Sequence, residues 1–252
     1  MSFAVAAEAY DRYMGRYSAL LSPQLADFAG VRAGQRALDV GSGPGALTGE
    51  LAGRLGPGSV AAVDPSESFV AAARDRLPGV EVHLATAEQL PFEPRTFDAA
   101  LAQLVVHFMA DPLAGLTEMA RVTRGGGVVA ACVWDFAGGR GPLGPFWEAA
   151  HELDPAVVDE SDLAGARDGH LVELLTKAGL SAVEQGELTI ATSHSTFDAW
   201  WAPFTQGVGP GGAYVARLSE EHRAALRERC RALLPPAPFE LSAVAWAARG
   251  RP

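Results

Sequence analysis

Cysteine and lysine are scarce in this sequence of 252 residues. Its two cysteines, Cys132 and Cys230, are too few for a disulfide framework or a metal cluster, and their apolar or helical neighbours are typical of buried thiols. Lys177 is the only lysine among 20 basic residues, and 30 acidic residues give a formal net charge of −10. Because binding to a polyanion requires a positive surface, we expect no nucleic-acid partner and no membrane partner.

Long hydrophobic runs and targeting signals are also absent. No stretch reaches the roughly 18 apolar residues of a transmembrane helix. The N-terminus lacks the basic region followed by an apolar run that a secretory signal has, and an acidic residue, Glu8, already appears there. We therefore expect a soluble, cytoplasmic protein. The hydrophobic fraction of 48% supports a folded core, and neither a repeat nor a long linker divides the chain, so we predict one domain over residues 1–252.

Hydrophobic periodicity predicts strands that alternate with helices as far as residue 134. Residues 1–30 have helical spacing. Strands are then expected at 36–40, 59–63, 80–85, 96–105 and 127–134, with helices at 46–55, 67–76 and 112–122. This order is typical of βαβ units in a parallel sheet that helices cover on both faces.

Beyond residue 134 this alternation ends. Helices are expected at 145–153 and 171–178, strands at 182–191 and 239–248, and a mostly helical insertion at 196–234. We therefore predict an α/β, Rossmann-like fold with a doubly wound, mostly parallel seven-stranded sheet and helices on both faces. Residues 135–168 and 196–234 are expected to form a partial helical cap.

The densest chemical signal is a glycine-rich turn after the first predicted strand. Gly41 and Gly43 have no Cβ, so the backbone can approach a ligand closely, and the next helix offers free N–H groups at its N-terminus. Asp64, nineteen residues after Gly45, ends the second predicted strand, where a carboxylate can accept hydrogen bonds from both ribose hydroxyls. The pattern indicates a nucleoside cofactor at the carboxyl ends of the strands.

Two cofactors fit this pattern. The string GSGPGA at residues 41–46 satisfies the G-x-G-x-x-G/A pattern of dinucleotide-binding proteins. Three neighbouring features favour S-adenosylmethionine instead: Asp39 two residues before the first glycine, the additional Gly45 in the loop, and the pair Ala87-Glu88 where an adenine edge would lie. An NAD-dependent oxidoreductase is the alternative.

Four segments carry a family resemblance. They are LDVGSGPGALT at residues 38–48, AAVDPSESFVAAAR at 61–74, ATAEQLPFEPRTFDAALAQLVVHFMADP at 85–112 and EMARVTRGGGVVAACVWD at 118–135. Together they resemble class I S-adenosylmethionine-dependent methyltransferases, in particular the small-molecule branch that includes the ubiquinone/menaquinone C-methyltransferases. YDRYMGRYS at residues 10–18 is similar to a helix that closes over the cofactor in many relatives.

The resemblance implies a cofactor and roles for particular residues. The cofactor is S-adenosylmethionine, with S-adenosylhomocysteine as product, and residues 1–30 close over it. Asp39 lies near its amino-acid end, Asp64 holds the ribose and Gln103 touches the methionine tail. The other implied contacts are Gly41, Gly43 and Gly45 around the methionine and ribose, Pro65, Ser66, Ala87 and Glu88 around the adenine, and Arg16 and Tyr17 closing the pocket.

Methyl transfer from a sulfonium depends on positioning more than on acid–base chemistry. We predict in-line displacement onto a small, hydrophobic or aromatic acceptor. His107, which follows the fourth predicted strand, is the candidate general base, and packing against loop residues is its alternative role. No metal is expected, because Asp111 stands alone in the segment that would supply clustered acidic ligands.

Aromatic residues are frequent after the fifth predicted strand. Candidates for the wall of a hydrophobic acceptor pocket are Trp134, Phe146, Trp147, Trp200 and Trp201. The helical spacing of Phe197, Trp200, Trp201 and Phe204 is also typical of a core stripe, so core packing is the alternative. The sequence is compatible with a monomer or a homodimer, and with a third function, a protein that binds S-adenosylmethionine without transferring a methyl group.

Overall fold

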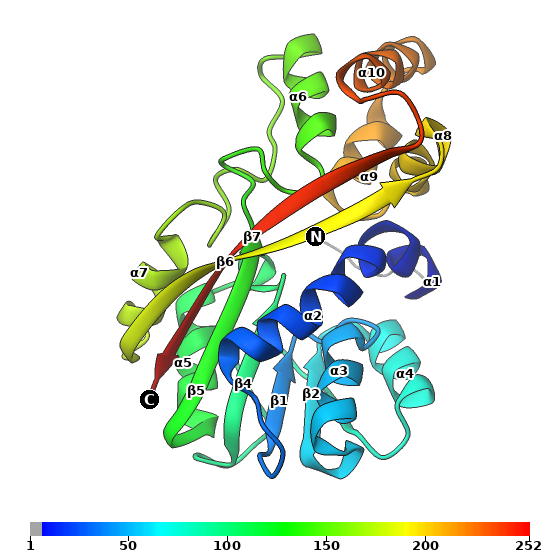
Figure 1. Ribbon diagram of the computed structural model, residues 1–252. Helices are drawn as coiled ribbons and strands as arrows, with labels where there is room; N and C mark the ends of the chain where they lie inside the picture. The colour runs from blue at the N-terminus through cyan, green and yellow to red at the C-terminus, as the bar shows by residue number, and fades with distance from the viewer. Residues whose placement is uncertain (1–6) are drawn as a thin grey trace.

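Short apolar segments form the parallel half of a sheet. The computed structural model describes residues 7–252. It contains β1 (Ala37–Val40), β2 (Val60–Asp64), β3 (Glu81–Leu84), β4 (Phe97–Gln103) and β5 (Thr123–Trp134). These strands pair in parallel in the order β3-β2-β1-β4-β5 (Figure 1). β1, β2 and β4 are buried along their whole length, as expected for strands that are covered on both faces.

Two long strands complete the sheet. β6 (Ser181–His194) and β7 (Phe239–Arg251) pair with each other in antiparallel fashion, and β7 also pairs antiparallel with β5. The full order is β3-β2-β1-β4-β5-β7-β6, which confirms the predicted mostly parallel, seven-stranded sheet. An antiparallel strand next to β5 distinguishes this sheet from the 3-2-1-4-5-6 order of dinucleotide-binding domains.

Helices cover both faces of the sheet, as predicted. One face packs against α2 (Arg16–Ala29), α3 (Ala46–Leu55) and α4 (Glu67–Arg76). The other packs against α5 (Pro112–Val122) and α7 (His170–Lys177) (Figure 1). Before α2, the chain forms α1 (Ala7–Tyr10) and a π-helical turn (Asp11–Gly15). The helical prediction for residues 1–30 is therefore met from residue 7 to residue 29, and residues 1–6 lie outside the described part of the chain.

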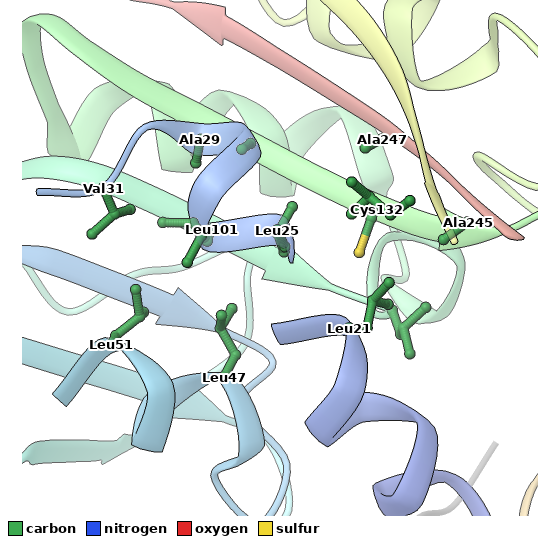
Figure 2. Packing of buried hydrophobic residues seen from close by; sticks show 14 of the residues in the cluster. Leu21, Leu25, Ala29, Val31, Leu47, Leu51, Leu101, Cys132, Ala245 and Ala247 are labelled. Carbon is green, nitrogen blue, oxygen red and sulfur yellow. The ribbon is translucent and has the colours of Figure 1, made fainter. Parts of the chain in front are cut away.

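The core on the first face fixes the N-terminal helix onto the sheet. Leu21 and Leu25 of α2 and Leu47 and Leu51 of α3 surround Leu101 of β4, and all five side chains are buried (Figure 2). Their spacing of four residues places each pair on one side of its helix. Burial of each leucine contributes about 1.5–3 kcal/mol, so α2 is held firmly beside the carboxyl end of β4.

The β6–β7 pair continues beyond the sheet and carries the cap (Figure 1). We use this name for residues 135–168 and 196–234, which contain α6 (Gly144–Leu153), α8 (Phe197–Trp201), α9 (Gly209–Arg217) and α10 (Glu220–Leu233). The cap has a hydrophobic core of its own, which includes Phe146, Trp200 and Phe204. The predicted partial helical cap is thus present.

Strand ends differ from the sequence prediction at the antiparallel edge. β6 continues to His194 and β7 to Arg251, each three residues beyond the expected end, because the two strands pair along their whole length. β5 begins at Thr123 rather than residue 127, and its register against β4 shifts between Phe97 and Ala99. These strand ends are set by pairing with segments that are distant in the sequence. Local hydrophobic periodicity does not indicate where such pairing stops.

Candidate functional site

A cavity of about 830 Å³ opens at the carboxyl ends of β1, β2 and β4, and we call it the main cavity. Ligand sites are expected at this edge of a doubly wound sheet. Nine of the residues that the sequence indicated line it: Gly41, Gly43, Asp64, Pro65, Ser66, Ala87, Glu88, Gln103 and His107. Four other implied cofactor residues, Arg16, Tyr17, Asp39 and Gly45, are not among the lining residues.

The glycines of the first loop serve different purposes. Gly41 has φ +72°, and a Cβ there would overlap the side chain of Val105, so only glycine fits. Gly43 has φ +54° and faces the main cavity. Gly45 has φ +103°, and a Cβ would lie 2.8 Å from Leu77 Cδ1. The structure therefore gives Gly45 a packing role between α3 and the end of α4, and its contact with the cofactor stays a prediction.

Asp64 organises the loop as well as facing the cavity. Its Oδ2 accepts a hydrogen bond from Gly43 N at 2.8 Å, and its Oδ1 accepts one from Ser66 N at 2.9 Å. Burial raises the pKa of the Asp64 carboxyl, and these two N–H donors oppose the rise. Because each carboxylate oxygen has more than one lone pair, both oxygens can still accept from a ligand.

Asp39 lies behind the loop. Its Oδ2 accepts a hydrogen bond from Thr48 Oγ1 at 2.6 Å, which ties β1 to α3, while its Oδ1 is buried without a hydrogen-bond partner. Burial raises the pKa of Asp39 to about 7. The side chain therefore supports the loop from beneath, and any effect on a ligand passes through that loop.

Gln103 connects the end of β4 to α2. Its Nε2 donates to Ser18 O at 3.2 Å and to Ser22 Oγ at 3.0 Å. Its Oε1 is buried and has no hydrogen-bond partner. A buried acceptor without a partner costs about 1–3 kcal/mol. Gln103 also lines the main cavity, while its Oε1 atom is buried beneath that surface.

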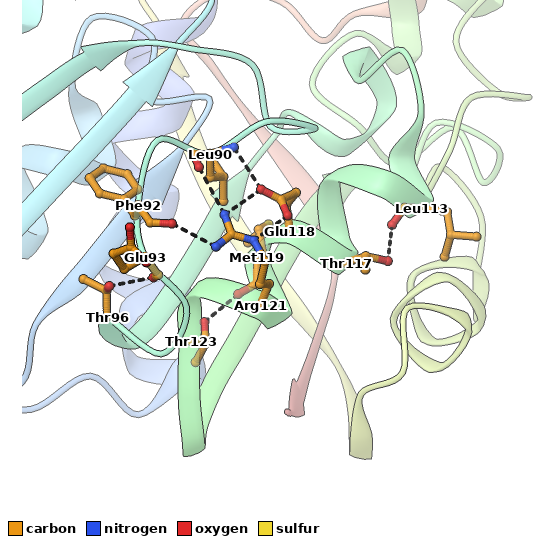
Figure 3. A network of polar contacts seen from close by, with 10 residues as sticks. All are labelled: Leu90, Phe92, Glu93, Thr96, Leu113, Thr117, Glu118, Met119, Arg121 and Thr123. Atoms are coloured by element: carbon orange, nitrogen blue, oxygen red, sulfur yellow. Dashed lines mark hydrogen bonds and ion pairs between the residues drawn. The ribbon is translucent and has the colours of Figure 1, made fainter.

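A polar network holds the Ala87-Glu88 segment in place. Arg121 of α5 binds Glu118 and donates to the carbonyl oxygens of Leu90 and Phe92, and Leu90 N donates to Glu118 Oε2 at 3.1 Å (Figure 3). Glu88 Oε1 accepts from Asp111 N at 3.2 Å. The loop that follows Ala87 is thereby fixed to α5, which gives the main cavity a rigid wall on this side.

His107 lies in the main cavity on a 3-10 turn (Val106–Phe108). Its ring packs against Phe108 at 3.9 Å and Phe136 at 5.7 Å between centroids, and its Nδ1 is buried without a hydrogen-bond partner. Burial lowers the pKa of His107 to about 3. The imidazole is therefore neutral at pH 7. With so low a pKa it is a weak base, whereas a general base works best with a pKa near the operating pH.

Comparison with known proteins decides between the two cofactors. Residues 38–131 match the methyltransferase domain family. The ubiquinone/menaquinone biosynthesis C-methyltransferase UbiE of Cupriavidus metallidurans is 33% identical over 180 residues, which cover 64% of this chain and 73% of that relative. The chain belongs to the class I S-adenosylmethionine-dependent methyltransferases. The cofactor of this family is S-adenosylmethionine, and the nicotinamide alternative is set aside.

Other comparisons define how far the likeness extends. The chain spans 33% to 52% of the length of five other curated relatives. The YcgJ protein of Bacillus subtilis has a TM-score of 0.59 at 18% identity, covering 94% of this chain and 98% of its own. The [4+2]-cyclase SpnF has a TM-score of 0.57 at 20% identity, covering 93% of this chain and 81% of its own. At these identities the likeness shows the methyltransferase fold alone.

Sequence reasoning missed Tyr10 as a residue of this methyltransferase-family site. Tyr10 lines the main cavity, its Cε1 lies 3.9 Å from where a Cβ on Gly43 would stand, and its ring is 5.1 Å from that of Phe69. Burial raises the pKa of Tyr10 to about 12, so the hydroxyl stays protonated. The resemblance pointed to the segment, because Tyr10 opens the stretch that is similar to the closing helix, but it did not indicate which residue of that stretch lies over the loop.

The residues proposed to close the pocket lie farther back. Arg16 places its guanidinium carbon 4.8 Å from the ring centroid of Tyr17. Tyr17 is buried and packs edge-on against Trp134, with 6.4 Å between ring centroids. The first turns of α2 therefore pack between the sheet and the cap, while Tyr10, one helical turn and a half earlier, covers the glycine loop.

The predicted acceptor wall is packed inside the protein. All five residues are buried, and none lines the main cavity: Trp134, Phe146, Trp147, Trp200 and Trp201. Phe146 stacks on Phe204 with 4.5 Å between centroids and an interplanar angle of 3°. The core-packing alternative describes the placement of four of these residues, while Trp147 also lines a second cavity of about 500 Å³ beside α6.

Proposed function

We propose that this chain transfers the methyl group of S-adenosylmethionine to a small, hydrophobic or aromatic acceptor, by in-line displacement that depends mainly on positioning. The observation that carries the proposal is the convergence of the glycine loop, Asp64 and Gln103 from three strand ends on one cavity. A relative with a name in ubiquinone/menaquinone biosynthesis supports an acceptor of this chemical class.

The residues of the main cavity fit the chemical groups of the cofactor. Asp64 has lone pairs available for the two ribose hydroxyls. Gln103 lines the cavity at the end of β4, where we place the methionine tail. Glu88, Ala87, Pro65 and Ser66 surround the part of the cavity where we place the adenine. Tyr10 covers the cofactor from the side of the N-terminal helix.

Bound S-adenosylmethionine supplies a methyl group that is already activated by the sulfonium. The chain's contribution is to orient, to exclude water and to hold the acceptor behind the methyl group. Positioning of this kind can supply about 7–11 kcal/mol of the barrier. Val105, His107 and Phe108 lie beside the end of β4 in the main cavity, and we assign them to the wall that the acceptor meets.

We infer that His107 acts as a neutral part of this wall rather than as a general base. Its Nδ1 has no hydrogen-bond partner, and burial lowers its pKa to about 3. His107→Ala should lower kcat less than about tenfold, whereas loss of a general base costs about 10²- to 10⁴-fold. The check is the pH profile of kcat for both proteins. A loss above a hundredfold, with the disappearance of an inflection from the profile, would restore the base.

The proposal is tested in two steps. Calorimetry with S-adenosylmethionine, S-adenosylhomocysteine and NAD⁺ should show binding of the first two only. Mass spectrometry of molecules that co-purify with the protein, followed by a screen of phenols, quinols and other small acceptors, should then reveal formation of S-adenosylhomocysteine. Absence of S-adenosylmethionine binding would refute the proposal.

A second candidate function is binding of the cofactor without methyl transfer. The cyclase SpnF has the same fold, so the fold alone does not require methylation. This candidate predicts tight binding of S-adenosylmethionine and no S-adenosylhomocysteine with any acceptor in the screen. The same two measurements therefore separate it from the methyltransferase.

A further inference from the structure

Among residues 7–252, the charged side chains that line the main cavity are all acidic. They are Asp64 at the end of β2, Glu67 in the first turn of α4 and Glu88 in the loop after β3, and no lysine or arginine of this part of the chain joins them. Two other titratable side chains there are neutral at pH 7, because burial lowers the pKa of His107 to about 3 and raises that of Tyr10 to about 12. The wall of the main cavity therefore carries negative charge without a cation to offset it.

The basic side chains of α4 have other partners. Arg74 donates to Val82 O at 3.1 Å from Nε and 2.7 Å from Nη2. Arg76 forms an ion pair with Asp11 at 2.8 Å. Although both arginines share a helix with Glu67, neither lines the main cavity. The carboxylates of the cavity wall are therefore not neutralised from this helix by direct contact.

A further carboxylate lies beneath the glycine loop. Asp39 is buried, and its Oδ1 has no hydrogen-bond partner. Burial raises the pKa of Asp39 to about 7 against the hydrogen bond from Thr48, and the charge of Asp64 adds to the rise. Above that pH, a fourth negative charge lies at the end of β1. A positive charge placed in the main cavity would offset the repulsion between these carboxylates.

The two forms of the cofactor differ by one charge. S-adenosylmethionine carries a sulfonium, an ammonium and a carboxylate, which leave a net positive charge, whereas S-adenosylhomocysteine is neutral overall. Methyl transfer removes the positive charge, because an electron pair of the acceptor forms the new bond to carbon while the pair of the S–CH₃ bond stays on sulfur. A proton that the acceptor loses goes to water. The adenosine and amino-acid portions are the same in both forms, so their contacts cancel when the two affinities are compared.

The carboxylates of the wall are within electrostatic reach of a charge anywhere in the main cavity. A cavity of about 830 Å³ is roughly 12 Å across, which is comparable to the Debye length of about 10 Å in 0.1 M salt. Attraction between a sulfonium and these carboxylates is therefore only partly screened. It is also stronger in a partly enclosed site than in bulk water, because the effective dielectric constant is lower there.

We propose that the main cavity selects the charged form of the cofactor, so that it binds S-adenosylmethionine more tightly than S-adenosylhomocysteine and releases the product once the sulfonium is lost. The preference itself concerns cofactor binding, whereas its use in product release rests on the proposed function. Glu67 is the residue best suited to reveal it. Glu67 lines the cavity and forms no ion pair within residues 7–252, so its charge can be changed without breaking a contact of that kind.

The test changes the charge at position 67 in steps. Wild type, Glu67→Gln and Glu67→Lys place a negative, a neutral and a positive side chain at the same point of the wall. Asp75→Lys is the matched control for Glu67→Lys. Asp75 is an exposed acid of α4 that does not line the main cavity, and its substitution changes the net charge of the protein by the same amount.

Isothermal calorimetry measures the Kd of S-adenosylmethionine and of S-adenosylhomocysteine for each protein. The titrations are run at about pH 8, above the pKa of about 7 of Asp39, so that this carboxyl is mostly ionised. They are repeated in about 20 mM and about 500 mM NaCl, between which the Debye length falls from more than the width of the cavity to well below it. The quantity compared is the ratio of the two Kd values.

In the wild type at low salt, S-adenosylmethionine should bind at least about tenfold more tightly than S-adenosylhomocysteine, and high salt should lower this ratio at least about threefold. Glu67→Gln should lower the low-salt ratio about twofold and Glu67→Lys about fourfold, through weaker binding of S-adenosylmethionine. The affinity for S-adenosylhomocysteine should change less than about twofold, because its thioether carries no charge. Asp75→Lys should keep the ratio of the wild type.

Four results would overturn the proposal. They are a wild type that binds S-adenosylhomocysteine as tightly as S-adenosylmethionine, a ratio that does not respond to salt, an unchanged ratio in Glu67→Lys, and an equal decrease in Asp75→Lys, which would assign the effect to the net charge of the protein. An equal loss of affinity for both forms in Glu67→Lys leaves the ratio unchanged and counts as the third result. If Glu67→Lys does not fold, Glu67→Gln decides. Failure of the proposed function would look different, since S-adenosylmethionine would be preferred while no acceptor yields S-adenosylhomocysteine.

Discussion

The parallel half of the sheet and the cap differ in the kind of side chain that they place at their functional and packing surfaces. β1, β2 and β4 end in glycines, a carboxylate and an amide that face the main cavity. The cap, carried by β6 and β7, fills its interior with rings that pack against one another. Small and polar residues leave space and unused hydrogen-bonding capacity, while large aromatic residues remove both. Polar atoms that face a cavity are therefore found in the first region, while the interior of the cap is filled by aromatic rings.

The junction of the two regions holds a charged side chain between two hydrophobic cores. Tyr13 belongs to the aromatic core of the cap, and Tyr17 belongs to the core under α2. Arg16, between them, has no carboxylate partner among the described residues. A polar group retained where two hydrophobic cores meet costs stability. Three substitutions test how separate the two regions are.

The largest effect is expected in the cap. Phe204 is buried and stacks on Phe146, so Phe204→Ala should lower the free energy of unfolding by about 3–5 kcal/mol. Urea denaturation measures the loss. Calorimetry on the folded variant should give an affinity for S-adenosylmethionine within about twofold of the wild type. A tenfold weaker affinity would show that the cap and the main cavity are coupled.

A smaller effect with the opposite distribution is expected at Asp64. Asp64→Asn removes the charge that faces the main cavity, and the affinity for S-adenosylmethionine should fall at least tenfold, or about 1.4 kcal/mol. Asp98→Asn is the matched control, because Asp98 is a buried carboxylate at the other end of the sheet, where it accepts from Arg36 N at 2.7 Å. Unchanged affinity in Asp64→Asn, or an equal loss in Asp98→Asn, would remove Asp64 from the ribose site.

The smallest effect concerns pH and Asp39. Its folded-state pKa of about 7 is raised by burial, above about 3.9 for an unfolded aspartate. The folded state therefore holds a proton that the unfolded state has released between these values, and the stability that Asp39 contributes is lost as the pH rises toward 7. The free energy of unfolding of the wild type, minus that of Asp39→Asn, should fall by about 1 kcal/mol from pH 5.5 to 6.5.

The difference between the two proteins is the quantity to measure. The folded-state pKa of His107 is lowered to about 3, so its contribution has the opposite sign and is lost as the pH falls below about 6.5. Subtraction of the Asp39→Asn curve cancels this term, because both proteins contain His107. A difference that is flat, or that rises with pH, would contradict the raised pKa of Asp39.

The site was predictable from sequence where the signal is local. Gly41 and Asp64 belong to short motifs, and each lies at the end of a strand of a few residues. Tyr10 was missed because nothing in its immediate neighbours shows that it packs over Gly43. Gly45 was placed correctly in the loop, but its close neighbour Leu77 comes from the end of α4. The packing role of Gly45 can therefore be recognised only from the tertiary structure.

The aromatic residues illustrate the same limit. Helical spacing places Phe197, Trp200, Trp201 and Phe204 on one stripe, and it does not say whether the stripe faces a ligand or another helix. The structure packs Phe204 against Phe146, a residue of α6 far away in the sequence. Whether the stripe forms a pocket wall or a core depends on the residues that it contacts in the folded protein.

By itself, the sequence determined the α/β fold, the order of strands and helices up to residue 134, and a nucleoside cofactor of the methyltransferase type. Hydrophobic periodicity, and a glycine loop followed at a fixed spacing by a carboxylate, are properties of short segments. They can therefore be recognised without knowledge of the tertiary structure. The tertiary structure alone decided which residues line the main cavity and which tyrosine covers the glycine loop. Each of these depends on burial between segments such as Ser18 and Gln103, which lie far apart in the sequence and meet only when the hydrophobic cores form.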